Sequence, residues 1–295
     1  MKQIVFTGSA AAIVTPFDGP AVDYPAFDRL VQRQIESGTD AIVVCGTTGE
    51  AATMSCDERM KLIARCVDTV NGRVPVIAGS GTNSTESSVA LSRAAQSAGA
   101  DALLTVTPYY NKASQSGLTA HFSAIADAVD IPVILYNVPS RTGVKCAAQT
   151  YQKLAAHPNI AGVKEASDDF DLIQDTFNLC PPDFTVWSGN DSSTTAVMAL
   201  GGKGVISVAA NVVPREMHEL TQLCLADRFR EAGQLQLRMN ALIRALFCEV
   251  NPIPVKAAMA RLGLCSGALR LPLTALSEMH AAQLARAMDA FGVSA

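Results

Sequence analysis

Eight short apolar runs, each followed by a segment with helical periodicity, constrain the fold of this 295-residue chain more than any other feature. They occupy residues 10–14, 41–45, 74–78, 102–106, 133–136, 160–164, 185–188 and 205–208. Because the runs are apolar throughout rather than at alternate positions, they predict parallel strands that are covered on both faces. Eight such units predict an α/β protein whose strands close into a (β/α)8 barrel of the TIM type, in preference to an open doubly wound sheet.

The segments between the runs carry helix-start signals. Ser55 and Glu58 have the spacing of a capping box, and Asn83 and Glu86 repeat it. Apolar residues then follow at helical spacing, as expected for helices that pack against a barrel.

No charge run or linker rich in proline and serine divides the chain, so one barrel with an appended region is expected. We predict a catalytic barrel over residues 1–227 and a C-terminal helical region over residues 228–295. The latter is expected to contain three helices, one of which begins after the segment 251–254.

The composition excludes several classes of protein. A net charge of -4, with the basic residues scattered singly, offers neither a nucleic-acid stripe nor a polybasic membrane patch. There is no apolar run long enough to span a membrane, and Thr7, Gly8 and Ser9 interrupt the apolar N-terminal stretch, so a signal peptide is not expected. Small molecules are therefore the expected partners.

The cysteines and histidines also argue against a disulfide framework or a metal site. The eight cysteines include no Cys-x-x-Cys pair, which is typical of free thiols in a reducing cytoplasm. None of the four histidines pairs at helical spacing with another histidine or with a cysteine. No glycine motif of a nucleotide-binding loop is present either. We therefore expect no bound nucleotide and no metal ion.

Polar groups follow several of the predicted strands, at the end of a barrel where chemistry is usually found. These groups lie in the segments 46–50, 107–111, 136–143, 164–166 and 188–191. They bring hydroxyls, phenols, one guanidinium and one amine to the same rim. The turn 46–50 also exposes backbone amides, which are suited to holding a carboxylate.

Lys164 is the amine of this rim and is the only lysine that closes a predicted strand. A buried ammonium is costly unless its pKa falls, and a neutral lysine is the group that attacks a carbonyl to form a Schiff base. The alternative is a strand-end lysine whose ammonium reaches water. The surrounding rim favours the first interpretation.

The motifs at 46–50, 107–110, 136–143, 162–165 and 251–256 together closely resemble the 4-hydroxy-tetrahydrodipicolinate synthase family, also called dihydrodipicolinate synthase, over essentially the whole chain. These enzymes belong to the pyruvate-dependent class I aldolases and lyases. The resemblance implies condensation of pyruvate with L-aspartate 4-semialdehyde, the first committed step towards diaminopimelate and lysine. Arg141 distinguishes this family from the aldolases of 2-keto-3-deoxy acids and from N-acetylneuraminate lyase, which remain the alternative enzymes.

The resemblance also implies a role for each matched residue. Lys164 would form the Schiff base with pyruvate without a cofactor, and Tyr136, Thr47 and Tyr110 would relay protons. The implied substrate-binding residues are Thr48, Arg141, Ile206, Gly189 and Asn251. Of these, Thr48 would hold the pyruvate carboxylate and Arg141 the carboxylate of the semialdehyde.

Family members are usually homotetramers built from tight dimers, in which the tyrosine matching Tyr110 reaches the neighbouring active site. Members that lysine inhibits bind it at the dimer interface. The matching positions here are Asn83, Tyr109, Ala52, Cys56, Arg59 and Ser87. Serine replaces the expected glutamate, and cysteine and arginine replace two histidines. Because a lysine ammonium needs a carboxylate partner and an arginine would repel it, we expect weak inhibition or none.

A barrel that only binds or senses a keto acid is an alternative of another class. The joint presence of Lys164, Tyr136 and Thr47 argues against it, since binding alone needs no reactive amine.

Overall fold

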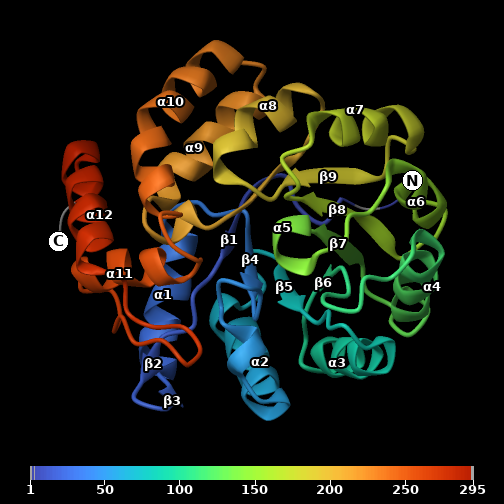
Figure 1. Ribbon diagram of the computed structural model, residues 1–295, viewed down its shortest axis with the longest axis horizontal. Helices are drawn as coiled ribbons and strands as arrows, with labels where there is room; N and C mark the ends of the chain where they lie inside the picture. Colours follow the sequence, from blue (N-terminus) through green and yellow to red (C-terminus); the bar gives the residue numbers. More distant parts are fainter. Residues whose placement is uncertain (1, 3, 294–295) are drawn as a thin grey trace.

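The structure is a computed structural model that describes residues 2 and 4–293. Residues 1, 3, 294 and 295 lie outside the described part, so the start of the predicted region 1–227 and the end of the predicted region 228–295 do too. Eight parallel strands close into a barrel in the order β1-β10-β9-β8-β7-β6-β5-β4 (Figure 1). They are β1 (Gly8–Ala12), β4 (Ala41–Val44), β5 (Val76–Gly79), β6 (Ala102–Val106), β7 (Val133–Asn137), β8 (Ile160–Glu165), β9 (Thr185–Ser188) and β10 (Gly204–Ser207). The predicted (β/α)8 barrel is confirmed.

The first strand lies two residues before the predicted run 10–14. Gly8 pairs with Gly204 where β1 meets β10, and a Cβ on Gly204 would lie 1.9 Å from the carbonyl oxygen of Gly8. This close backbone approach fixes where β1 begins, and the apolar pattern could not show it. Ile13 and Val14 stay buried although they lie beyond the strand.

A small antiparallel hairpin follows, formed by β2 (Phe17–Asp18) and β3 (Ala21–Val22). The predictions did not include it, because two-residue strands leave no periodic signal.

The helices surround the barrel as an outer layer (Figure 1). They are α1 (Tyr24–Glu36), α2 (Cys56–Val70), α3 (Thr85–Ser97), α4 (Gln115–Ala126), α6 (Ala148–Leu154), α7 (Phe170–Leu179), α8 (Thr194–Ala199) and α9 (Pro214–Leu225). The short helix α5 (Pro139–Thr142) lies inside this ring, near the centre of the view in Figure 1. Short 3-10 turns η1 (Ala51–Thr53), η2 (Asp191–Ser193) and η3 (Ala209–Asn211) lie in the connecting loops.

One of the two predicted helix starts is confirmed and the other is off by one residue. Ser55 and Glu58 form the capping box of α2, each side chain accepting a hydrogen bond from the other residue's amide. In α3 the cap is Ser84, not Asn83, because the Ser84 hydroxyl accepts from the amide of Ser87 at 3.3 Å.

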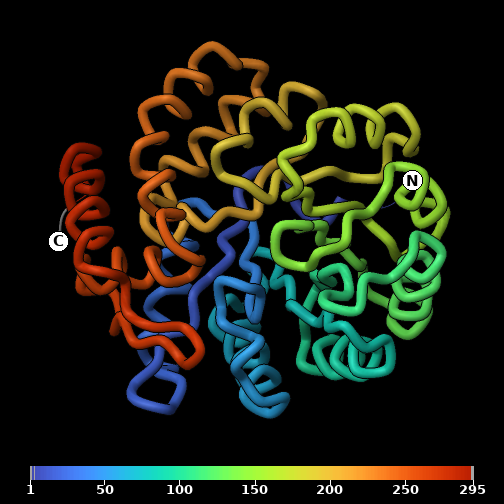
Figure 2. The backbone as a smooth tube through the Cα atoms, in the orientation of Figure 1, coloured from blue at the N-terminus to red at the C-terminus, as the bar shows by residue number. Residues whose placement is uncertain are grey.

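The C-terminal part of the chain forms α10 (Phe229–Ala245), α11 (Ile253–Arg261) and α12 (Glu278–Phe291). Figure 2 shows this orange and red segment running along one side of the barrel, with α10 packed against α8 and α9. In the part of the chain that the structure covers, no helix combines the length and apolar character needed to cross a membrane.

The side chains of each strand alternate between two cores. Val163 and Leu135 face the helices, whereas Tyr136 and Ile206 belong to the core inside the barrel. The same alternation directs Lys164, one residue after Val163, into the barrel. The alternation of side chains along β8 therefore points the Lys164 amine into the barrel interior rather than towards the helices.

Candidate active site

Lys164 is buried inside the carboxyl end of the barrel, with only 5% of its surface exposed. It lies beside Tyr136 on the neighbouring strand, and its Nζ is 4.4 Å from the centroid of the Tyr136 ring. The barrel thus holds an amine against a phenol in a site largely closed to water.

Burial lowers the pKa of the Lys164 ammonium from its ordinary value of 10.5 to about 8. The carboxylate of Asp191 opposes this shift, and the guanidinium of Arg141 adds to it. With a pKa of about 8, roughly one amine in ten is neutral at pH 7, far more than at the ordinary pKa. Lys164 is therefore poised to act as a nucleophile.

Tyr136 is equally buried, and burial raises the pKa of its hydroxyl above the ordinary value of 10. Arg141 and the Thr47 side chain oppose this shift. The phenol is therefore protonated at neutral pH and can donate a proton to a group held beside Lys164.

A cavity of about 170 Å³ opens above Lys164 and is large enough for a small keto acid. Seven of the nine residues predicted for catalysis and substrate binding line it: Thr47, Thr48, Tyr136, Arg141, Lys164, Gly189 and Asn251. Ile206 lies in the core inside the barrel instead, among the residues that support this cavity.

Three of these residues form a connected wall. The Asn251 side-chain amide donates to the Thr48 hydroxyl at 3.0 Å, and Arg141 Nη2 donates to the Asn251 carbonyl at 3.2 Å. Because Asn251 precedes α11, the C-terminal helices help to position the loops after β4 and β7. Arg141 makes no ion pair with a carboxylate among the described residues, so its charge is available to an anion in the cavity.

Gly189 has a sufficient structural reason for its place at the cavity. Its amide donates to the Glu165 carbonyl at 2.7 Å, and an added Cβ would lie 2.5 Å from the Cβ of Ala166. Any larger residue would separate the loops after β8 and β9.

Tyr110 does not reach the cavity of its own chain. It is 89% exposed, and its φ of 74° is unusual for a tyrosine. A large aromatic side chain held outside the body of the chain in this way is available to a second copy.

Asp191 is the main residue that the predictions missed. Its carboxylate is buried after β9, and one oxygen accepts from the amides of Val208 at 3.1 Å and Ala209 at 2.9 Å. Among the described residues, none forms a hydrogen bond with the other oxygen. Burial raises the pKa of Asp191, while the nearby Lys164 opposes that shift. The sequence could have indicated Asp191, because it ends the segment 188–191, which was expected to lie on the catalytic rim.

The six positions matched to an effector site separate into two groups. Ala52, Arg59 and Tyr109 line a second cavity of about 360 Å³, which shares Thr47, Tyr136 and Arg141 with the first. Asn83, Cys56 and Ser87 are not among the residues that line it; Cys56 and Ser87 are exposed.

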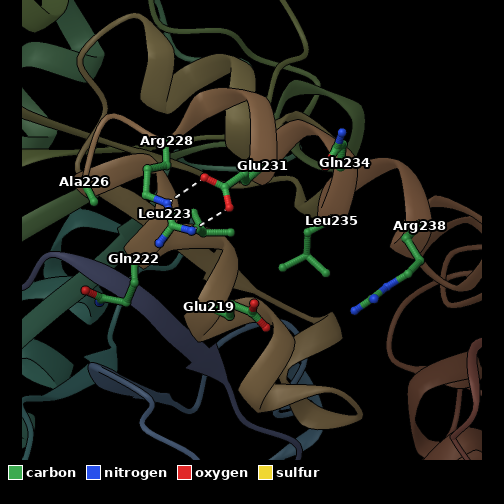
Figure 3. Close-up of a pocket in the computed structure, with 9 residues that line it drawn as sticks. All are labelled: Glu219, Gln222, Leu223, Ala226, Arg228, Glu231, Gln234, Leu235 and Arg238. Carbon is green, nitrogen blue, oxygen red and sulfur yellow. Dashed lines mark hydrogen bonds and ion pairs between the residues drawn. The ribbon is translucent and has the colours of Figure 1, made fainter.

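A larger cavity of about 640 Å³ lies on the surface between α9 and α10 (Figure 3). It holds the exposed ion pair between Arg228 and Glu231 but none of the predicted site residues. Because it lies between two outer helices and is lined by none of the residues around Lys164, we do not assign this cavity to the candidate active site. Among residues 2 and 4–293, no three His, Cys, Asp or Glu side chains gather in a way that could hold a metal ion.

Comparisons with known proteins agree with this geometry. The family model described as the dihydrodipicolinate synthetase family matches residues 5–291. The 4-hydroxy-tetrahydrodipicolinate synthase of Acetivibrio thermocellus is 47% identical over 293 residues, which cover 99% of this chain and 100% of that protein. The crystal structure of dihydrodipicolinate synthase from Thermotoga maritima is 43% identical and superposes with a TM-score of 0.97, covering 98% of this chain and 99% of that one. Similarly, a dihydrodipicolinate synthase from Cyanidioschyzon merolae, solved with lysine bound, is 41% identical with a TM-score of 0.95, covering 99% of this chain and 100% of that one.

Proposed function

We propose, from the premise that this chain belongs to the dihydrodipicolinate synthetase family, that its site condenses pyruvate with L-aspartate 4-semialdehyde to 4-hydroxy-tetrahydrodipicolinate. The observation that carries the proposal is the buried Lys164 amine beside the Tyr136 phenol in a cavity that also presents Arg141. This combination supplies a nucleophile, a proton donor and a cation for a carboxylate.

The chemistry begins at Lys164. Its neutral amine adds to the ketone carbon of pyruvate, and loss of water gives an iminium ion. The iminium draws electrons from the methyl group, which loses a proton to become an enamine. The enamine carbon bonds to the aldehyde carbon of the semialdehyde. The amino group of the semialdehyde then replaces Lys164 on the former ketone carbon, which closes the ring and frees the enzyme.

The other residues bind the substrates and move protons. Tyr136, together with Thr47 and a Tyr110 from a second subunit, relays protons to and from the intermediates. Thr48 and the amides of its loop hold the pyruvate carboxylate. Gly189, Ile206 and Asn251 shape the pocket, and Arg141 takes the carboxylate of the semialdehyde. The reaction needs no bound cofactor, because the lysine itself provides the covalent intermediate.

Supplying substrates separately tests the proposal. Pyruvate alone should form an adduct with the enzyme but give no product, whereas pyruvate with aspartate semialdehyde should turn over. Turnover only with other aldehyde partners would favour a different pyruvate-dependent aldolase. Binding of pyruvate without any covalent adduct would favour a sensor barrel.

Replacing Arg141 with alanine is expected to weaken use of the semialdehyde more than formation of the pyruvate adduct. Loss of a charge-assisted contact should reduce kcat/KM for the semialdehyde roughly ten- to a hundredfold. Arg141→Lys is the matched control, because it keeps the charge but loses the planar fork. Its kcat/KM for the semialdehyde should lie between those of the unmodified enzyme and Arg141→Ala. Equal loss of adduct formation and condensation would show instead that Arg141 supports the fold of the site.

Tyr110 is expected to act across a subunit interface, because it is exposed on its own chain. Tyr110→Phe and Lys164→Ala should each be inactive or nearly so. Hybrids of the two should regain activity, since one of the two sites in a mixed dimer then has an intact Lys164 and receives an intact Tyr110. Purified mixed dimers without activity would mean that Tyr110 works within its own chain.

Asp191→Asn is expected to change the titration of Lys164 while preserving the hydrogen bonds that its carboxylate accepts from the loop after β10. Since the carboxylate favours the ammonium, its loss should move the pH midpoint of adduct trapping below about 8. Turnover should nevertheless fall roughly tenfold, because the iminium loses a stabilising charge. Asp168→Asn is the control, since Asp168 lines the same cavity without acting on that pKa. If the pH midpoint did not change, Asp191 would have no effect on the pKa of Lys164 and would act only as a structural residue.

We also propose a homotetramer built from tight dimers, with residues 1–227 as the catalytic barrel and residues 228–295 as a helical region that carries Asn251 to the site. All eight cysteines are free thiols in the structure, which supports action in a reducing cytoplasm.

A further inference from the structure

Two polar residues lie directly behind Lys164 and Tyr136. Tyr136 pairs with Lys164 where β7 meets β8, and the next pair along the two strands is Asn137 with Glu165. Because side chains alternate along a strand, Asn137 and Glu165 point towards the outer helices, whereas Lys164 and Tyr136 point into the barrel. Asn137 is fully buried and Glu165 is only 4% exposed. A single chain therefore encloses this pair, whatever its state of assembly.

Glu165 carries a buried carboxylate that neutral donors hold on both oxygens. Its Oε1 accepts from the Asn137 side-chain amide at 3.0 Å and from the Ser167 backbone amide at 2.9 Å. Its Oε2 accepts from the Tyr151 hydroxyl at 2.8 Å and from the Asn137 amide at 3.1 Å. Burial raises the pKa of Glu165, and these hydrogen bonds oppose that rise. Across the part of the chain that the structure describes, Glu165 joins no ion pair.

The orientation of Asn137 is fixed by a second contact. Its Oδ1 accepts from the Cys146 backbone amide at 3.1 Å, so its NH2 group must face Glu165. The contact with Cys146 also closes the base of the segment 138–145, which carries Arg141. One network therefore holds the end of β7, the end of β8 and the segment that presents the guanidinium.

Packing alone does not require a carboxylate at this position, because apolar side chains of similar volume are usually at least as stabilising as a buried charge. The carboxylate adds fixed directions, since each of its hydrogen bonds constrains a distance and an angle. Tyr151 belongs to α6 in the outer layer (Figure 1), so its hydroxyl anchors Glu165 to a rigid element.

We propose that Glu165 is a positioning residue, which holds the ends of β7 and β8 together and thereby sets how the Lys164 amine and the Tyr136 hydroxyl lie relative to each other. The inference rests on the proposed function for the roles of these two groups. The loop after β4, which is proposed to hold the pyruvate carboxylate, supplies none of the hydrogen bonds to Glu165. Loss of the network should therefore slow proton transfer more than it weakens pyruvate binding.

Glu165→Gln tests the inference in the full-length enzyme. The variant keeps the shape of the side chain but turns one acceptor oxygen into an NH2 group that faces other donors. Pyruvate with borohydride labels the competent sites, so the rate can be expressed for each labelled site. We expect kcat for each labelled site to fall at least about tenfold, while the KM for pyruvate stays within about twofold.

Tyr151→Phe is the milder variant and decides the test if Glu165→Gln does not fold. It removes one donor to Oε2 and leaves both hydrogen bonds to Oε1, so kcat for each labelled site should fall about threefold. Because Tyr151 is inferred to act through Glu165, the double variant should be no less active than Glu165→Gln.

Thr176→Val is the matched control. The Thr176 hydroxyl is also buried next to the barrel, but it donates to the Leu172 carbonyl of its own helix α7 at 2.7 Å. Its removal should lower the Tm at most slightly and leave kcat for each labelled site unchanged.

Three results would overturn the inference. If Glu165→Gln and Tyr151→Phe lower the Tm but keep a normal kcat for each labelled site, the network only supports the fold. If the two losses add in the double variant, Tyr151 does not act through Glu165. If a higher KM for pyruvate accounts for the whole loss, the network serves binding. Failure of the proposed function would be seen separately, because the unmodified enzyme would then not be labelled or would not turn over.

Discussion

Replacing Lys164 with alanine is expected to reduce turnover by roughly a thousandfold or more, because the described residues that line the cavity supply no other amine to form the covalent intermediate. In the unmodified enzyme, borohydride added with pyruvate should inactivate the protein and leave a mass increment on the peptide that contains Lys164. Peptide mass spectrometry and the steady-state rate measure both effects.

The pH dependence of trapping gives an independent check. Since burial lowers the pKa of Lys164 to about 8, the neutral amine becomes the main form only above that pH. The trapping rate should therefore rise as the pH increases through about 8 and then level off. An unperturbed lysine would still gain rate well above pH 8.

Lys203→Ala is the matched control, because Lys203 precedes β10 at the opposite end of the barrel. It should keep normal turnover and normal labelling. A label on another lysine, or near-normal turnover of Lys164→Ala, would rule out the covalent mechanism.

Replacing Lys256 with methionine is expected to cause the largest loss of stability. Lys256 Nζ lies 2.6 Å from Glu50 Oε1, and neither side chain is exposed to solvent. Nζ also donates to the Thr15 carbonyl at 2.9 Å and lies 4.2 Å from the centroid of the Phe17 ring. Removing the amine leaves the Glu50 charge buried without its partner, which typically costs about 3–5 kcal/mol of the free energy of unfolding. Denaturant or thermal unfolding measures the loss.

The double variant Lys256→Met with Glu50→Gln separates charge from packing. With both charges removed, most of the lost stability should return, because the main cost is the unpaired carboxylate. The exposed pair of Lys61 and Asp57 supplies the control, and Lys61→Met should have little effect. If Lys256→Met is no less stable than this control, the buried pair makes no net contribution.

This ion pair also shows why distant parts of the chain cooperate at the site. Glu50 ends the loop that carries Thr47 and Thr48, and Lys256 lies on α11. The pair therefore ties the C-terminal helices to the loop that is proposed to hold pyruvate. We expect Lys256→Met to impair activity as well as stability.

The sequence by itself determined the barrel and singled out the amine that is proposed to react. Both depend on local patterns, since runs of apolar residues specify strands and Lys164 is the only lysine that closes such a run. The structure buries this lysine, and burial is the main cause of its lowered pKa.

Only the tertiary structure decided which distant residues meet these groups. Gly8 and Gly204 fix the seam between β1 and β10, and the Asp191 carboxylate opposes the lowering of the Lys164 pKa, yet neither fact follows from local periodicity. Each depends on how the closed barrel brings together segments that are far apart in the chain. Charge interactions and backbone approaches depend on distances of a few ångströms, and barrel closure sets those distances.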